Sequence, residues 1–321
     1  MKFDMVAEGG GVKIPALAGA YEAIVNKGFE PSHCAGTSAG AIVASCVAAG
    51  YKPDELKKII TTTDFKTFKD GSDWRIWQFW NLVRRNGVFN GDEFYKYIKH
   101  LLAEKGVHTF KDLRDLSEPK DKRYTYRFKC MASDITSGSL LSLPDDLPEY
   151  GIDPDTFEVA MAVRMSMSIP FFFKPVYLEN KLSEGKWYGK KHMIVDGGMI
   201  SNYPIWIWDN EDEPAWPTFG LLLYADKEDK PVKTTNPVNA AVAMFQTMLK
   251  ANDKTFVRPD DFINRTISIP TGNVSSIDFD LTNQRKAVLY KNGREAAETF
   301  LEGWSWSRYK RWAINSRTRN V

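Results

Sequence analysis

A single serine stands between two glycines in the stretch HCAGTSAGAIVA, residues 33–44. In the pattern G-x-S-x-G a strand turns sharply into a helix, and this turn exposes the serine hydroxyl as a nucleophile. Crowding in the turn favours very small residues two positions to either side, and Gly36 and Gly40 hold those positions. Ordinary strand-to-helix connections can carry the same pattern, so Ser38 needs a base and an oxyanion site beside it to be a nucleophile.

The base is the next requirement, and the histidines are His33, His100, His108 and His192. His33 precedes Ser38 by five residues on the same expected strand, which separates them by roughly 16 Å. His100 and His108 fall in a helical region and its following loop, where surface positions are the ordinary interpretation. Asp196 in HMIVDGG is the better candidate, because the glycines after it permit close approach to another backbone. The alternative is a plain Asp-Gly turn.

An oxyanion site could come from Gly9, Gly10 and Gly11, which follow the first expected strand and precede a helix. Their N–H groups could point at the developing negative charge, helped by the helix N-terminus. A dinucleotide fingerprint would need glycine at Ile14, and a P-loop would need Ser or Thr after Lys13, so neither phosphate-binding motif fits. The triple glycine is therefore either an oxyanion loop or a packing turn.

The elements that carry these motifs predict a three-layer α/β/α sandwich with a mostly parallel central sheet and a nucleophile elbow. At the N-terminus a strand over 2–8, a helix over 15–27, a strand over 31–37 and a helix over 39–49 alternate, with glycine turns after both strands. Further strands are expected at 124–135, 140–143, 192–198, 218–225 and 264–270, helices at 155–167, 236–250 and 282–302, and a mostly helical region over 53–116.

Three motifs occur in one chain order: GGGVK at 9–13, GTSAG at 36–40 and DGG at 196–198. In this combination the sequence resembles the patatin-like phospholipase family. A fourth segment, MSMSIPFFFKP at 165–175, is similar to the A-S-x-S-x-P-x-x-F-x-P segment of that family. The resemblance covers roughly residues 3–205. It implies a catalytic dyad without histidine, with Ser38 as the nucleophile and Asp196 as its base.

The resemblance also implies that the N–H groups of the glycine loop, Gly9 to Gly11, form the oxyanion hole. Two positions depart from the family pattern: Ile14 stands where the family usually has glycine, and Met165 where it usually has alanine. The first affects the start of the following helix, and the second could narrow the acyl channel. The implied reaction is serine esterase chemistry in lipid degradation, and no metal or other cofactor is needed for it.

The implied function is hydrolysis of fatty-acyl esters of phospholipids, of the phospholipase A type. A neutral-lipid lipase or general carboxylesterase is the nearest alternative, and a membrane-surface binding or effector module with a vestigial dyad is an alternative of another class. Two tryptophan-rich stretches, DWRIWQFWNLVRR at 73–85 and GWSWSRYKRWAINSRTRNV at 303–321, could contact a bilayer interface. The same pattern is also typical of helices whose tryptophans pack into a core.

Composition limits the remaining classes. The chain has 321 residues, without repeats or a long linker, so we expect one domain over 1–321, with residues 206–321 completing the motif-bearing part. Its net charge of +2 argues against a nucleic-acid partner. Cys34, Cys46 and Cys130 form no C-x-x-C pair, which favours buried, reduced thiols over disulfides or zinc. With no recognisable signal peptide or transmembrane run, we expect a cytoplasmic protein, with peripheral membrane contact left open.

Overall fold

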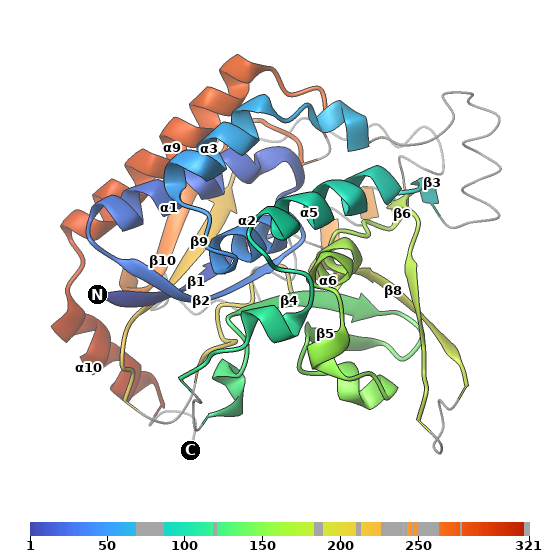
Figure 1. Ribbon diagram of the computed structural model, residues 1–321. Coiled ribbons are helices and arrows are strands. Elements are labelled where there is room, and N and C mark those ends of the chain that lie inside the picture. Colours follow the sequence, from blue (N-terminus) through green and yellow to red (C-terminus); the bar gives the residue numbers. More distant parts are fainter. Residues whose placement is uncertain are drawn as a thin grey trace.

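A mixed β-sheet forms the centre of the computed structural model (Figure 1). The structure describes residues 1–68, 87–117, 121–182, 189–209, 213–225, 240, 243–244, 247–248, 263–276 and 278–317. In this part of the chain the strand order is β10-β9-β1-β2-β4-β8-β7, and β5 also pairs with β4. The strands are β1 (Lys2–Ala7), β2 (Glu30–Thr37), β4 (Phe128–Asp134), β5 (Ser139–Leu143), β7 (Val176–Glu179), β8 (Lys191–Asp196), β9 (Thr218–Tyr224) and β10 (Thr266–Pro270).

Pairing changes direction at β4. The strands from β10 to β4 run parallel, whereas β5 and β8 pair with β4 in the antiparallel sense, and β7 pairs antiparallel with β8. A separate parallel pair joins β3 (Gly87–Phe89) to β6 (Phe171–Phe173). The chain therefore forms a mixed sheet whose parallel part combines β1 and β2 from the first third of the chain, β4 from the middle third, and β9 and β10 from the last third.

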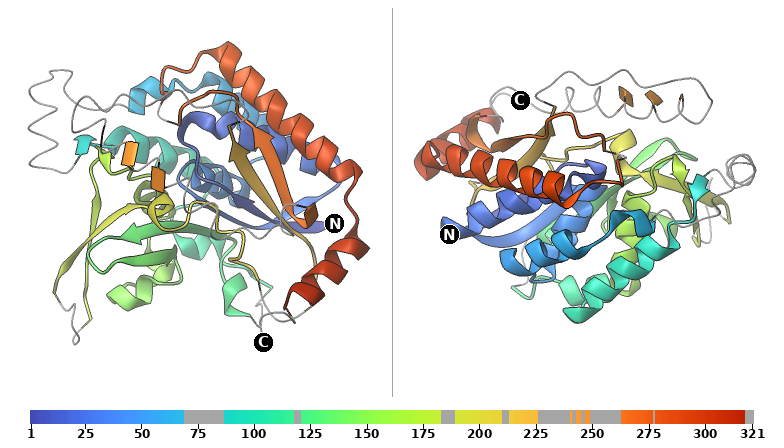
Figure 2. Two further views of the ribbon diagram at one scale, coloured as in Figure 1. Left: turned by 180° about the vertical axis from the view of Figure 1, so that it is seen from behind. Right: turned by 90° about the horizontal axis from the view of Figure 1, so that it is seen from above.

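Helices pack on one face of this sheet (Figures 1 and 2). They are α1 (Ile14–Asn26), α2 (Ala39–Ala48), α3 (Pro53–Thr62), α5 (Asp92–Glu104), α6 (Val159–Ser166) and α9 (Asn283–Glu302), and α10 (Trp306–Arg317) follows near the end of the chain. Alternation along β1 separates the faces: Met5 joins the larger core under the helices, whereas Val6 packs with Tyr203 and Trp208 on the other side. The segment around Tyr203–Trp208 thus covers the second face.

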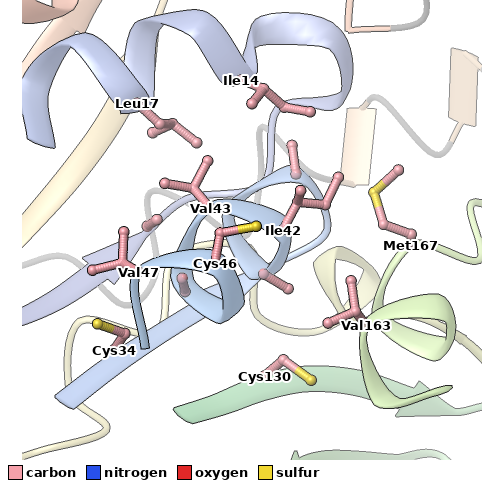
Figure 3. Packing of buried hydrophobic residues seen from close by; sticks show 14 of the residues in the cluster. Ile14, Leu17, Cys34, Ile42, Val43, Cys46, Val47, Cys130, Val163 and Met167 are labelled. Atoms are coloured by element: carbon pink, nitrogen blue, oxygen red, sulfur yellow. The ribbon is translucent and has the colours of Figure 1, made fainter. Parts of the chain in front are cut away.

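The fully buried helix α2 occupies the middle of the larger core. Figure 3 shows Val43 of α2 next to Leu17 of α1, and Val163 of α6 lies to the other side. The three cysteines are free and buried, as the sequence predicts. Burial raises the pKa of the Cys46 thiol to about 12, so this thiol is protonated at neutral pH.

Most expected elements near the motifs are confirmed, including the α/β layering and the strand-helix alternation of the first fifty residues. The helix expected over 155–167 is shorter, because residues 157 and 158 are extended. Glu158 bridges to Thr109, and the backbones of Phe157 and Phe110 are hydrogen-bonded. The sequence pattern does not predict strands β3, β6 and β7. The helix expected over 236–250 lies mostly outside the described residues.

Tryptophans near the C-terminus pack within the protein. The Trp304 ring lies 5.1 Å from Phe219 and 5.7 Å from Phe29, and its indole N–H donates to the Asn264 carbonyl. The Arg265 guanidinium lies 5.0 Å from the Trp312 ring centroid. Trp304 packs against the larger core, as the core interpretation expects, whereas Trp312 is half-buried beside Arg265. The stretch 73–85 lies outside the described residues. Across the described ranges, no helix combines the length and the apolar character needed to cross a membrane.

Candidate active site

Ser38 occupies the turn between β2 and α2. Its backbone has φ 52° and ψ −122°, in the left-handed half of conformational space that non-glycine residues rarely adopt. Such a conformation costs on the order of 1–3 kcal/mol and persists only where the surroundings impose it. A Cβ at Gly36 would lie 2.4 Å from the Gly40 carbonyl carbon, and one at Gly40 would lie 2.1 Å from the Ala7 oxygen. The turn therefore requires glycine at both positions.

The strand register brings Asp196 to the level of this turn. Thr37, the last residue of β2, pairs with Met131 of β4, and the next residue, Ala132, pairs with Asp196 of β8. Ser38 and Asp196 therefore leave the sheet on either side of one strand. Strand β2 runs parallel to β4, whereas β8 runs antiparallel to it. The chain therefore arrives at Asp196 from the direction opposite to that in which it arrives at Ser38.

Asp196 is buried and only partly satisfied by hydrogen bonds. Its Oδ1 accepts the Gly198 N–H at 2.8 Å, whereas its buried Oδ2 has no hydrogen-bond partner among the described residues. Desolvation by burial raises the pKa of Asp196 to about 7, and the Ser38 side chain and the Gly198 N–H act in the opposite direction. A carboxylate with such a pKa is about half ionised at neutral pH, which suits a general base.

A segment at the end of α6 contacts both residues. The Ser38 N–H donates to Ser166 Oγ at 2.9 Å, and the Ser38 hydroxyl donates to Met167 Sδ at 3.3 Å. The Asp196 N–H donates to the Ser168 carbonyl at 2.9 Å. The Ser38 hydroxyl therefore points to sulfur in this structure, close enough to Asp196 to influence its pKa. The motif at 165–175 is visible in the sequence, but nothing in its pattern predicts these contacts of Ser166, Met167 and Ser168.

The glycine loop, Gly9 to Gly11, lies directly against Ser38. A Cβ at Gly9 would lie 3.2 Å from Ser38 Cβ and 2.2 Å from Asn202 Oδ1. The Gly9 N–H donates to the Asn202 carbonyl at 3.1 Å, so this amide is already engaged. In the described part of the chain, no acceptor is found for the N–H groups of Gly10 and Gly11. These two amides remain available for an oxyanion.

Ser276, from the last third of the chain, also contacts this loop. Gly11 has φ +57°, and a Cβ there would lie 1.8 Å from the Ser276 carbonyl oxygen. The same oxygen accepts the Val12 N–H at 3.1 Å. Ile14 then begins α1, with Pro15 in its first turn. Isoleucine at position 14, where the family usually has glycine, therefore does not displace the helix, because α1 begins directly after the loop.

The histidines have other neighbours. The pairs are His33 with Asp4 and Asp115, His100 with Glu104, and His192 with Asp134. His108 lies after α5, and its backbone N–H donates to Asp112. None of these four described histidines is hydrogen-bonded to Ser38, whose partners are Ser166 and Met167. The described residues also contain no group of three or more His, Cys, Asp or Glu side chains that could hold a metal ion.

A serine on a strand-to-helix turn above an α/β sheet is typical of hydrolases with a nucleophile elbow. The Patatin-like phospholipase family model matches residues 5–208. This chain belongs to the patatin-like phospholipase family, a family of lipid hydrolases.

Relatives of this chain occur in bacteria and viruses. The uncharacterized protein YqhO of Bacillus subtilis (strain 168) is 37% identical over 311 residues, covering 95% of this chain and 100% of YqhO. The probable lipid hydrolase 463L of invertebrate iridescent virus 6 is 22% identical over 300 residues, covering 91% of this chain and 87% of 463L. The crystal structure of VipD from Legionella pneumophila superimposes with a TM-score of 0.54 at 17% identity. The match covers 94% of this chain and 66% of VipD, and it supports the fold alone.

Proposed function

We propose that this protein is a serine lipid acyl hydrolase that cleaves fatty-acyl ester bonds of phospholipids, with a single domain over residues 1–321. The observation that carries the proposal is the pairing of a strained, buried serine with a buried aspartate. Ser38 and Asp196 stand at one level of the sheet, and burial raises the pKa of Asp196 to about 7. Family membership supports lipids as substrates.

The first half of the reaction forms an acyl-enzyme. Asp196 takes the Ser38 proton on its unpartnered Oδ2 while Ser38 Oγ bonds to the ester carbonyl carbon. The N–H groups of Gly10 and Gly11 stabilise the resulting oxyanion. When the tetrahedral intermediate collapses, the bond to the leaving alcohol breaks, and Asp196 returns the proton to that alcohol.

The second half releases the fatty acid. A water gives a proton to Asp196 as its oxygen attacks the acyl carbon, and the same glycine amides hold the second oxyanion. Collapse breaks the bond to Ser38 Oγ, and Asp196 returns the proton to the serine. The Ser38 hydroxyl must turn from Met167 Sδ toward Asp196 before the first step, a rotation about one side-chain bond.

An exposed phenyl ring near the site supports contact with a lipid surface. Phe171 is 42% exposed and has φ +66°, a conformation that is unusual for a bulky residue. It follows Met167 by four residues, so its backbone lies within about 14 Å of that residue. Strained residues cluster at functional sites, and we propose that Phe171 inserts into the lipid surface that supplies the substrate.

The test compares the wild type with Ser38→Ala and Asp196→Asn on a water-soluble acyl ester and on phosphatidylcholine vesicles. We expect both variants to stay folded by circular dichroism and to lose hydrolysis, and we expect a fluorophosphonate probe to label the wild type but not Ser38→Ala. Faster turnover of vesicles supports the phospholipase, whereas hydrolysis of the soluble ester alone would replace it with a carboxylesterase. A folded wild type that hydrolyses neither substrate and takes up no probe would refute the enzyme.

A further inference from the structure

Asn202 lies six residues after Asp196, where the chain crosses from the base to the glycine loop. Its backbone carbonyl accepts the Gly9 N–H at 3.1 Å. Its side-chain Nδ2 donates to the Gly9 carbonyl at 3.2 Å and to Glu8 Oε1 at 3.0 Å. Both backbone polar groups of Gly9 are therefore bound by one residue, and Asn202 is 4% exposed.

Glu8 fixes this arrangement to the sheet. Its Oε1 accepts from Asn202, and its Oε2 accepts the backbone N–H of Leu223 at the end of β9. Glu8 is 3% exposed, so the two hydrogen bonds form away from solvent. A buried carboxylate needs donors, and an amide NH₂ group supplies one to Glu8 and a second to the Gly9 carbonyl without adding charge.

The planarity of the peptide bond turns this contact into a constraint on the oxyanion loop. In a trans peptide the C=O of one residue and the N–H of the next point in opposite directions. The donor on Asn202 that holds the Gly9 carbonyl therefore fixes the direction of the Gly10 N–H. Within the described residues that N–H has no acceptor, and the loop that carries it touches Ser38.

We infer that Asn202 is a positioning residue that aims the Gly10 N–H at the oxyanion, through the hydrogen bond from its side chain to the Gly9 carbonyl. The inference rests on the proposed function, because it assigns Gly10 to the same oxyanion site. Asn202 touches neither the substrate nor the reacting atoms in this role.

The backbone around Asn202 is held independently of its side chain. Thr37 Oγ1 donates to the Ser201 carbonyl at 3.0 Å, and the Gly9 N–H to Asn202 carbonyl bond involves main-chain atoms only. Replacing the Asn202 side chain therefore leaves two hydrogen bonds between this segment and the site. The replacement removes the hydrogen bond from Asn202 Nδ2 to the Gly9 carbonyl. Without this bond the orientation of the Gly10 N–H is no longer fixed.

The experiment measures kcat and KM of Asn202→Ala and Asn202→Asp on a water-soluble acyl ester from pH 5 to pH 9. For Asn202→Ala we expect kcat to fall by about 10- to 100-fold with KM nearly unchanged, since a misdirected donor acts on the transition state. Asn180→Ala is the matched control. Asn180 is also buried and donates to a carbonyl, at 3.3 Å, but it lies after β7, and its loss should leave kcat unchanged.

Asn202→Asp provides a readout that loss of packing would not give. The introduced carboxyl has nearly the shape of the amide, but it can donate a hydrogen bond only while protonated. We expect its rate to rise and then fall with pH, because ionisation places a second carboxylate beside Glu8 and removes the donor. The wild type should instead rise to a plateau. The Asp variant also covers the case in which Asn202→Ala fails to fold.

Two outcomes would overturn the inference. One is a folded Asn202→Ala whose kcat stays within about threefold of the wild type. The other is an Asn202→Asp whose pH profile parallels that of the wild type. In both cases an active wild type and an inactive Ser38→Ala leave the proposed function standing. A wild type without hydrolysis or fluorophosphonate labelling would instead refute the proposed function, and the inference with it.

Discussion

Burial of Asp196, the proposed base, makes the stability of the protein depend on pH, and Asp196→Asn makes that dependence measurable. Folding raises the pKa of this carboxyl from 3.8 to about 7, so the folded protein binds the proton more tightly than the unfolded chain does. The contribution of this group to stability is complete below pH 3.8 and is lost as the pH rises through about 7. Asparagine does not titrate, so the variant lacks this loss.

The magnitude follows from the shift. Each pH unit between the unfolded and folded pKa values corresponds to about 1.4 kcal/mol. Between pH 5 and pH 8 the free energy of unfolding of the wild type should therefore decrease by about 2.5 kcal/mol relative to that of Asp196→Asn. Groups common to both proteins, such as the buried Asp4, cancel in this difference.

The assay is urea unfolding of both proteins at pH 5, 6, 7 and 8, followed by tryptophan fluorescence. The variant should gain stability relative to the wild type as the pH rises, with most of the gain before pH 7. A difference that stays constant within about 0.5 kcal/mol would refute the reasoning, because it would mean that Asp196 titrates alike in both states. If the wild type instead gained stability relative to the variant as the pH rises, a hydrogen-bond donor would have to stabilise the ionised Asp196 in the folded protein.

Three further predictions concern the base, the elbow and the lipid surface. Because Asp196 must be ionised to act as a base, kcat/KM on a soluble ester should rise about tenfold per pH unit below 7 and level off above pH 8; a flat profile would exclude this base. Gly40→Ala should lower the free energy of unfolding by about 1–3 kcal/mol, because its Cβ would lie 2.1 Å from a β1 carbonyl oxygen. Gly303→Ala is the control and should leave the free energy of unfolding unchanged, because no heavy atom lies within 4 Å of a Cβ there. Phe171→Asp should reduce the hydrolysis of vesicles about tenfold and that of a soluble ester less than twofold. Leu116→Asp, at another exposed apolar position, is the control. Equal losses on both substrates, or an equal effect of Leu116→Asp, would refute the insertion of Phe171 into the lipid surface.

Sequence reasoning works best where the structure is local. The strand, glycine turn and helix around Ser38 are encoded within about twenty residues. Gly36 and Gly40 predict a crowded turn, and in the structure a Cβ at either position would collide with backbone atoms. The direction of β8 could not be predicted, because its pairing with β4 connects segments some sixty residues apart. Likewise β6 and β7 lie in a phenylalanine- and proline-rich stretch whose pattern alone predicts no strand.

The supporting residues of the candidate site were the harder part to predict. Asp196 and Ser38 belong to short motifs, but Asn202 contacts Gly9 across more than 190 positions of the chain. Met167 belongs to the motif at 165–175, yet its contact with the serine hydroxyl depends on where α6 ends. The spacing of six residues between Asp196 and Asn202 predicts no role for the asparagine. Its role depends on which distant segment lies beside it, and only the folded structure gives that.

The hold of Ser276 on the glycine loop has a consequence for biosynthesis. A ribosome that has released the first 150 residues has already produced the serine and the triple glycine, but neither the aspartate nor the carbonyl of Ser276 that fixes Val12. The nascent chain therefore contains Ser38 long before the glycine loop and Asp196 are in place beside it. If the proposed function holds, the hydrolase becomes active only when the last third of the chain has folded onto the first.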